Sequence, residues 1–270
     1  MMKYQEYSTF FRMRFIAGLQ YRAAALAGVA TQFVWGILEL QMYKAFYKEN
    51  AAAFPMSMEA LSTYIWLQQS LLALFMTWFL ENDIFQSITD GQIAYELCRP
   101  ADLYNMWFFR SMANRLSKAV LRCMPILVFA VFLPAPYGMR LPADIRAGIW
   151  FVITAFLGFI TVIAFCMLIY ISTFYTYSPM GIRLVAVALV DVLAGNVIPI
   201  PFLPEGVRQV VELLPFASMG NIPFRVYASD ITGIEIYYKA GLQLFWAVAL
   251  ILLGKRIIAA ALKRVVVQGG

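Results

Sequence analysis

The sequence predicts an all-α integral membrane protein with six transmembrane helices, an N-terminal interfacial helix, a short helix in a cytoplasmic loop, and re-entrant or amphipathic helices on the outer side. Two observations carry this prediction. Of the 270 residues, 62% are hydrophobic and 13% are charged, whereas about a quarter of residues are charged in a typical soluble domain. The chain also contains six apolar runs near the length of about 20 residues that crosses a bilayer.

The composition also excludes several classes of function. The net charge of +6 does not indicate a nucleic-acid-binding protein, because the basic residues lie in short loops between apolar runs and not in one stripe. There is no histidine, and Cys98, Cys123 and Cys166 are far apart and form no C-x-x-C pair. This argues against zinc, haem, thiol redox and histidine-based catalysis, so we expect no metal and no cofactor in this chain.

Residues 1–22 are predicted to form a helix at the membrane interface. Tyr7, Phe11, Phe15 and Leu19 recur at every fourth position, and charged residues fall off that line. An amphipathic helix with its apolar side among the lipid headgroups explains this pattern.

The six predicted spans cover about residues 23–43, 61–80, 118–134, 148–172, 182–200 and 240–261. The third has the weakest pattern because Arg122 and Pro125 lie within it. It crosses the bilayer only if Lys118 and Arg122, one turn apart, extend their charged ends to the nearer interface. With the N-terminus inside, fourteen of the 21 Lys and Arg residues lie on the inner side, which predicts that both termini are cytoplasmic.

Two connections between spans are long. The outer one, residues 201–238, is rich in Pro and Gly and contains an amphipathic pattern, with Arg208 and Glu212 forming an i,i+4 pair opposite an apolar face. It is predicted to dip into the outer interface as a re-entrant segment. The inner one, residues 81–117, interrupts the apolar runs with polar and turn-forming residues.

The inner loop is predicted to contain a helix, a sharp turn and a second helix. Asn82 or Asp83 caps the first helix, and Gly91 supplies the left-handed turn that ends it. Pro100 suits the first turn of a second helix from Ala101 onward. The first helix has one apolar face, formed by Ile84, Phe85 and Ile88.

The run GQIAYELCRP in this loop contains Gly91, Ile93, Leu97 and Arg99-Pro100. It resembles the G-x-[IL]-x-x-x-L-x-R-P block of a bacterial branch of type-2 ABC exporter permeases. The similarity extends over the whole chain, from the interfacial helix through six spans to the outer re-entrant segment. It implies one transmembrane domain over residues 1–270.

The resemblance implies that residues 84–90 are a coupling helix that inserts into a groove of an ATPase subunit. Polar side chains would pair across the rim of that contact, and apolar ones, including Ile93, would fill its pockets. The alternative is that Arg99-Pro100 only ends one element and begins the next at the lipid surface. The residues implied in ATPase coupling are Phe85, Ile88, Asp90, Gly91, Glu96, Leu97, Arg99 and Pro100.

The chain has no G-x-x-x-x-G-K-[ST] phosphate loop. It is therefore predicted not to be an enzyme itself, and ATP and Mg would be bound by a partner ATPase. The resemblance implies two ATPase subunits, a second permease that is identical or a sister chain, and a location in the bacterial plasma membrane.

Polar residues inside spans are candidates for the transport path or the permease dimer interface. The first span carries Gln32 and Glu39 on one stripe, and the fifth carries Asp191 near its middle and Asn196 a turn above. The resemblance implies that these two spans line the substrate route. Each residue has an alternative role in an internally satisfied helix contact, and Asp191 could be protonated. Gln68 and Gln69 of the second span are expected to form structural hydrogen bonds.

Two other functions remain to be compared. An ion-coupled secondary transporter would use Asp191 as its ion site, but it predicts inverted repeats and broken mid-membrane helices, and no repeat is evident. A membrane-embedded enzyme needs clustered catalytic groups, whereas the acidic residues of the spans are scattered.

Overall fold

The computed structural model describes residues 4–51, 54–176 and 178–263. Every described element is helical. Among the described residues, three helices are long and apolar enough to cross a membrane: Arg22–Asn50, Ile145–Tyr175 and Glu235–Leu262. They coincide with the first, fourth and sixth predicted spans, which confirms a membrane protein. The segments predicted as the other three spans have a different form.

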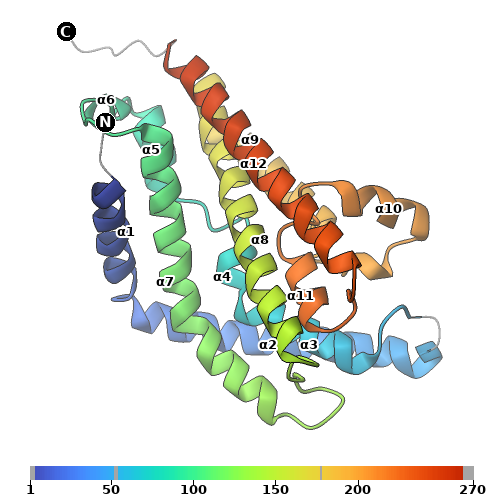
Figure 1. The fold of residues 1–270 in the computed structure, drawn as a ribbon. Helices are drawn as coiled ribbons and strands as arrows, with labels where there is room; N and C mark the ends of the chain where they lie inside the picture. Colours follow the sequence, from blue (N-terminus) through green and yellow to red (C-terminus); the bar gives the residue numbers. More distant parts are fainter. Residues whose placement is uncertain (1–3, 52–53, 177, 264–270) are drawn as a thin grey trace.

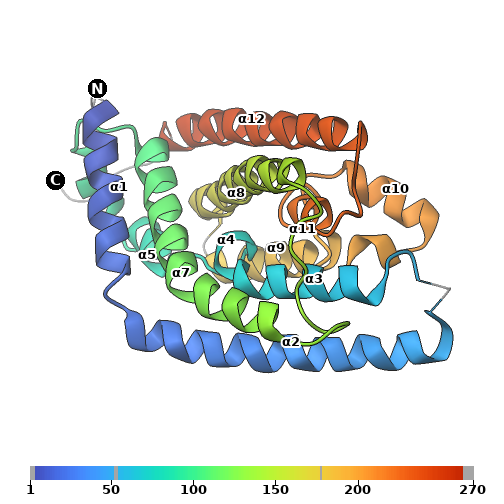
Figure 2. The ribbon, with the colours of Figure 1, turned by 60° about the horizontal axis from the view of Figure 1, so that its bottom comes forward.

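The four longest helices are α2 (Arg22–Asn50), α7 (Leu103–Phe132), α8 (Ile145–Ser172) and α12 (Glu235–Leu262). Figure 1 shows α8 and α12 side by side along most of their length, and their contact is the most extensive between any two elements. In Figure 2, α2 and α12 run in the same general direction on opposite sides of α8, and α1 (Tyr4–Gly18) runs across their ends. The helix α8 therefore forms the centre of the bundle.

The second predicted span is a broken helix. The helix α3 (Met58–Ser70) is followed by α4 (Leu72–Phe75), and Leu71 between them has non-helical backbone angles. In and just after α4, the buried Arg115 of α7 donates hydrogen bonds to the carbonyl oxygens of Leu74, Met76 and Phe79 at 3.2, 2.8 and 3.2 Å. These bonds satisfy carbonyl groups that have no partner in a helix, so the chain can leave the helix before residue 80.

The third predicted span is part of a longer helix. The helix α7 begins at Leu103, where the N-cap Asp102 accepts a hydrogen bond from the backbone N–H of Asn105 at 2.8 Å. It runs beside α1 and then bends to run beside α2 and α3 (Figure 2). Pro125 lies inside the helix and removes one backbone hydrogen bond, which favours a bend.

The fifth predicted span is shorter than expected. The helix α9 (Pro179–Leu193) starts at the N-cap Ser178 and ends before Gly195, whose φ of +78° reverses the chain. The chain then continues through the 3-10 turn η3 (Ile200–Phe202).

The segment predicted to be re-entrant, residues 201–238, contains the two short helices α10 (Glu205–Leu213) and α11 (Asn221–Tyr227). Glu212 of α10 does not pair with Arg208 as predicted, but accepts hydrogen bonds from Arg225, at 2.7 Å, and from Lys239 of α12. Arg225 and Lys239 are buried, and a buried cation without a partner is costly. The free energy gained when Glu212 neutralises two buried cations from other helices is larger than that of an i,i+4 ion pair on the surface of one helix.

Two further short helices, α5 (Asn82–Thr89) and α6 (Ile93–Leu97), lie between α4 and α7. Together with α1 and the last turns of α12 they occupy one end of the bundle, and α10 lies toward the opposite end (Figure 2). The helices α5 and α6 are thus at the opposite end of the molecule from α10.

Candidate functional site

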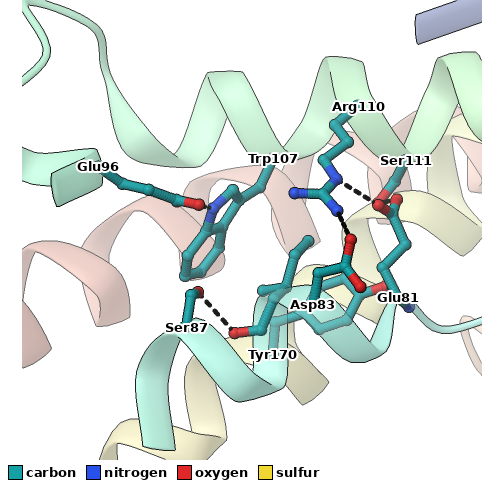
Figure 3. A network of polar contacts seen from close by, with 9 residues as sticks. Glu81, Asp83, Ser87, Glu96, Trp107, Arg110, Ser111 and Tyr170 are labelled. Atoms are coloured by element: carbon teal, nitrogen blue, oxygen red, sulfur yellow. Dashed lines mark hydrogen bonds and ion pairs between the residues drawn. The ribbon is translucent and has the colours of Figure 1, made fainter. Parts of the chain in front are cut away.

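The start of α5 is anchored by a buried polar network, shown in Figure 3. Arg110 of α7 bonds to the carboxylate of Glu81 and, at 2.7 Å, to Asp83. Ser111 donates to Glu81 at 3.1 Å, and the backbone N–H of Glu81 donates to the hydroxyl oxygen of Tyr170 at 2.8 Å. The side chains of Arg110 and Glu81 are only 10% and 12% exposed. This network attaches the N-terminal end of α5 to both α7 and α8.

Neither Asn82 nor Asp83 caps α5 as predicted. The N-cap position is occupied by Glu81, and no side chain accepts a hydrogen bond there. The carboxylate of Asp83 bonds to Arg110, and the amide oxygen of Asn82 accepts a hydrogen bond from Arg183 of α9 at 2.9 Å. Both side chains are therefore used for contacts with other helices.

The apolar face of α5 is covered by this chain itself. Ile84 and Phe85 are buried, and the ring centroid of Phe85 lies 5.0 Å from that of Tyr170. Ile88 is half-buried against the same core, and Ile93 of α6 is buried. The expectation that Phe85 and Ile93 fill pockets of a partner is corrected, because Tyr170 and its neighbours on α8 already enclose this face.

The exposed part of the loop lies farther along, at α6 and the turns that flank it. Gly91 has a φ of +75°, so the predicted left-handed turn is present. Glu96 does not join Asp90 and Arg99 in a rim, because it accepts a hydrogen bond from the indole of Trp107 at 2.7 Å. The second helix begins at Leu103 and not at Ala101. The exposed residues predicted for coupling are Asp90, Gly91, Leu97, Arg99 and Pro100.

Tyr95 was not singled out by the sequence pattern, although it lies inside the GQIAYELCRP block. Its side chain is 78% exposed, and that of Leu97 is 39% exposed. An exposed aromatic ring next to an exposed aliphatic side chain is the composition typical of a protein contact. The helix α6 has only five residues. A pattern of this length does not reveal from the sequence that Ile93 is buried and Tyr95 is exposed.

The four residues predicted for the transport path line one cavity of about 650 Å³. Gln32 and Glu39 reach it from α2, Asp191 from α9, and Asn196 from the turn after α9. The wall also contains three aromatic side chains and one cation. The sequence analysis did not assign these residues to the site: Trp35, Trp78, Phe79 and Arg122.

Hydrogen bonds from amides hold the acidic groups of the cavity. Asn196 donates to Asp191 at 3.1 Å, and Gln69 donates to Glu39 at 3.3 Å. Gln68 donates to the backbone carbonyl of Asn196 at 3.1 Å, so Gln68 and Gln69 form hydrogen bonds between elements, as expected. The network joins α2, α3 and the end of α9.

Gln32 differs from the other polar residues of the cavity. It is 4% exposed, and within the described part of the chain neither its amide nitrogen nor its amide oxygen has a hydrogen-bond partner. An unsatisfied amide is costly when it is buried, so a polar group in the cavity would stabilise it. The combination of aromatic rings, amides and charges suits an amphipathic molecule.

A family model described as "ABC-2 family transporter protein" matches residues 33–269. That range includes α5, α6 and Asp191, and Gln32 lies just before it. No curated protein matches the chain. Among the residues that the structure describes, no group of three or more His, Cys, Asp or Glu could hold a metal ion.

Proposed function

The chain belongs to the ABC-2 family of transporter proteins, and from this membership we propose that it is the permease subunit of an ATP-driven exporter in the bacterial branch with the G-x-[IL]-x-x-x-L-x-R-P block. A protein of this family is a membrane transport subunit, and the family implies a partner ATPase. The proposal adds that the ATPase docks at the loop from α5 to α6.

The observation that carries this proposal is the way the loop is held. Its outer tip, with Tyr95 and Leu97, is exposed, whereas its base is tied to α7 and α8 through the buried pair of Arg110 and Glu81 and the hydroxyl of Tyr170. A contact that moves the tip therefore moves two long helices with it. A loop that only marked the lipid surface would not need a buried ion pair at its base, since such a pair has a high desolvation cost.

The cavity beside α2 and α9 is the proposed substrate path. Its volume of about 650 Å³ is within the range of small-molecule sites, and its lining of Trp35, Trp78 and amide groups offers both apolar and polar contacts. Gln32, Glu39, Asp191 and Asn196 are the polar residues that would contact the substrate or a second permease.

The proposed assembly contains one transmembrane domain per chain, over residues 1–270, with six spans. Two ATPase subunits bind ATP and Mg, and a second permease, identical or a sister chain, completes the path. Both termini are cytoplasmic in the bacterial plasma membrane. The placement of α1 and the last turns of α12 at the end that carries α5 supports this orientation.

Reconstitution in vesicles with the partner ATPase tests the proposal against an ion-coupled transporter. We expect transport that requires hydrolysable ATP and that persists when a protonophore and an ionophore remove every ion gradient. A matched preparation with an ATPase that binds but does not hydrolyse ATP is the control. Transport that stops with the gradients and ignores ATP would reject the exporter and favour an ion site at Asp191.

A further inference from the structure

A second cavity, of about 440 Å³, lies where α1, the first turn of α2 and the bend of α7 meet. The helices α1 and α7 run side by side in both Figure 1 and Figure 2. The cavity is at the end of the bundle that carries α5. Arg122 lines both this cavity and the larger one, but the functional role proposed above does not use the smaller cavity.

The cavity has an excess of positive charge. Its basic lining residues are Arg14, Lys118, Arg122 and Arg110, and its acidic ones are Glu81 and Asp83. Both acids bond to Arg110. Within residues 4–51, 54–176 and 178–263, Arg14, Lys118 and Arg122 form no ion pair.

The side chains of Lys118 and Arg122 pack against an aromatic ring, and that of Arg122 also packs against the backbone of α2. The Nζ of Lys118 lies 5.3 Å and the guanidinium carbon of Arg122 lies 5.8 Å from the ring centroid of Phe79. A Cβ on Gly28 would lie 2.5 Å from that guanidinium carbon, so the Arg122 guanidinium packs directly on the backbone of α2. Its Nε is buried and has no hydrogen-bond partner among the described residues.

Arg14 also packs against an aromatic ring. Its guanidinium lies 5.5 Å from the ring centroid of Phe10. Burial, and then the neighbouring charge of Arg110, lower the pKa of Arg14 from its ordinary value, and the charges of Glu81 and Asp83 offset this only in part. An anion in the cavity would offset both effects.

The remaining wall of the cavity is apolar or aromatic and includes Tyr21, Ala24, Leu80 and Leu121. A free phosphate ion gains nothing from such a wall, whereas a phospholipid places a phosphate next to glycerol and acyl groups. On α1, the large apolar side chains of Met13 and Ile16 are exposed, which suits a helix in the headgroup layer. Basic pockets at this depth bind anionic headgroups.

We propose that this cavity binds the phosphate group of an anionic phospholipid, held by Arg14, Lys118 and Arg122, with the acyl chains leaving past Leu121 and Ala24. The bound lipid joins the interfacial helix α1 to the bend of α7, and so to the helix that anchors the coupling loop. The inference needs only that the chain is a membrane protein, and it does not rest on the exporter mechanism.

Native mass spectrometry of the full chain in a neutral detergent tests this proposal without any ATPase. The probes are phosphatidylglycerol, phosphatidylcholine with the same acyl chains, and inorganic phosphate. We expect retention of phosphatidylglycerol in preference to phosphatidylcholine. Each of Arg14→Gln, Lys118→Gln and Arg122→Gln should weaken retention about fivefold, which is the usual contribution of one basic side chain near an anionic surface.

Arg12→Gln is the matched control, because Arg12 lies on the same helix, is exposed and does not line the cavity. Arg14→Lys and Arg122→Lys keep the charge and should retain most of the lipid, and thermal unfolding without lipid verifies that each variant folds. Equal retention of both lipids, an equal effect of Arg12→Gln, or displacement of the lipid by millimolar inorganic phosphate would overturn the proposal.

Discussion

Replacement of Arg110 by methionine should destabilise the protein more than any change at an exposed ion pair. Methionine keeps an unbranched side chain of similar length but removes the charge. It leaves the carboxylate of Glu81, 12% exposed, with only the hydroxyl of Ser111 as a side-chain donor. Removal of one partner from a buried ion pair costs about 3–5 kcal/mol. We expect a loss of that size in the free energy of unfolding.

The two acids that bond to Arg110 should differ sharply in their contributions. The side chain of Asp83 is 77% exposed, and an exposed ion pair contributes at most about 1 kcal/mol. Asp83→Asn is therefore the matched control, with the same helix and the same partner but a solvated group. The double variant Arg110→Met/Glu81→Gln should recover most of the loss, because the only charge that it leaves without Arg110 is the exposed carboxylate of Asp83.

Denaturant unfolding of the purified chain in mild detergent measures these differences, and ATP-driven transport measures their consequence for coupling. We expect Arg110→Met to weaken coupling even under conditions where the chain stays folded, and Asp83→Asn to have little effect. If Asp83→Asn costs as much as Arg110→Met, or if the double variant costs the sum of its two single changes, the buried pair is not what anchors α5.

Three further changes have expected outcomes. Gly91→Ala places a side chain at a φ of +75° and should cost about 1–2 kcal/mol, seen as a lower thermal midpoint, whereas Gly91→Asn should cost less. Asp191→Asn should leave folding intact and reduce transport, and unchanged transport would remove its charge from the mechanism. Burial raises the pKa of Glu212, but the hydrogen bonds and charges of Lys239 and Arg225 outweigh this and hold it below its ordinary value of 4.5. The stability that Glu212 contributes is therefore present above about pH 4.5 and is lost as the pH falls through the lower folded pKa; a thermal midpoint measured from pH 7 to pH 3 should show this loss, and Glu212→Gln should flatten it.

Several features could be predicted because their causes are local. The apolar runs of α2, α8 and α12 are long enough to be recognised without knowledge of their neighbours. Gly91 marks a turn because only glycine adopts a positive φ without strain. The polar residues of the first and fifth predicted spans could be grouped because intramembrane polar side chains are rare, and all four line one cavity.

Other features depend on partners far away in the sequence. The helix α4 ends at Phe75 where Arg115, 39 residues beyond Met76, satisfies the backbone carbonyls. Phe85 is buried because Tyr170 lies over it, and the start of α7 at Leu103 places Arg110 and Arg115 inside the protein. In the sequence these arginines indicate a loop, since nothing near them identifies the acids and carbonyls that they bind.

The most direct test of the central claim is whether the partner ATPase stays bound when the exposed tip of the α5–α6 loop is changed. Tyr95→Glu and Leu97→Glu alter exposed side chains, and Leu141→Glu, at a site that is 75% exposed in a different connection, is the control. We predict that the ATPase co-purifies with the unchanged protein and with Leu141→Glu but is lost from the double variant Tyr95→Glu/Leu97→Glu. An ATPase that remains bound to that folded double variant would contradict the assignment of this loop as the docking site.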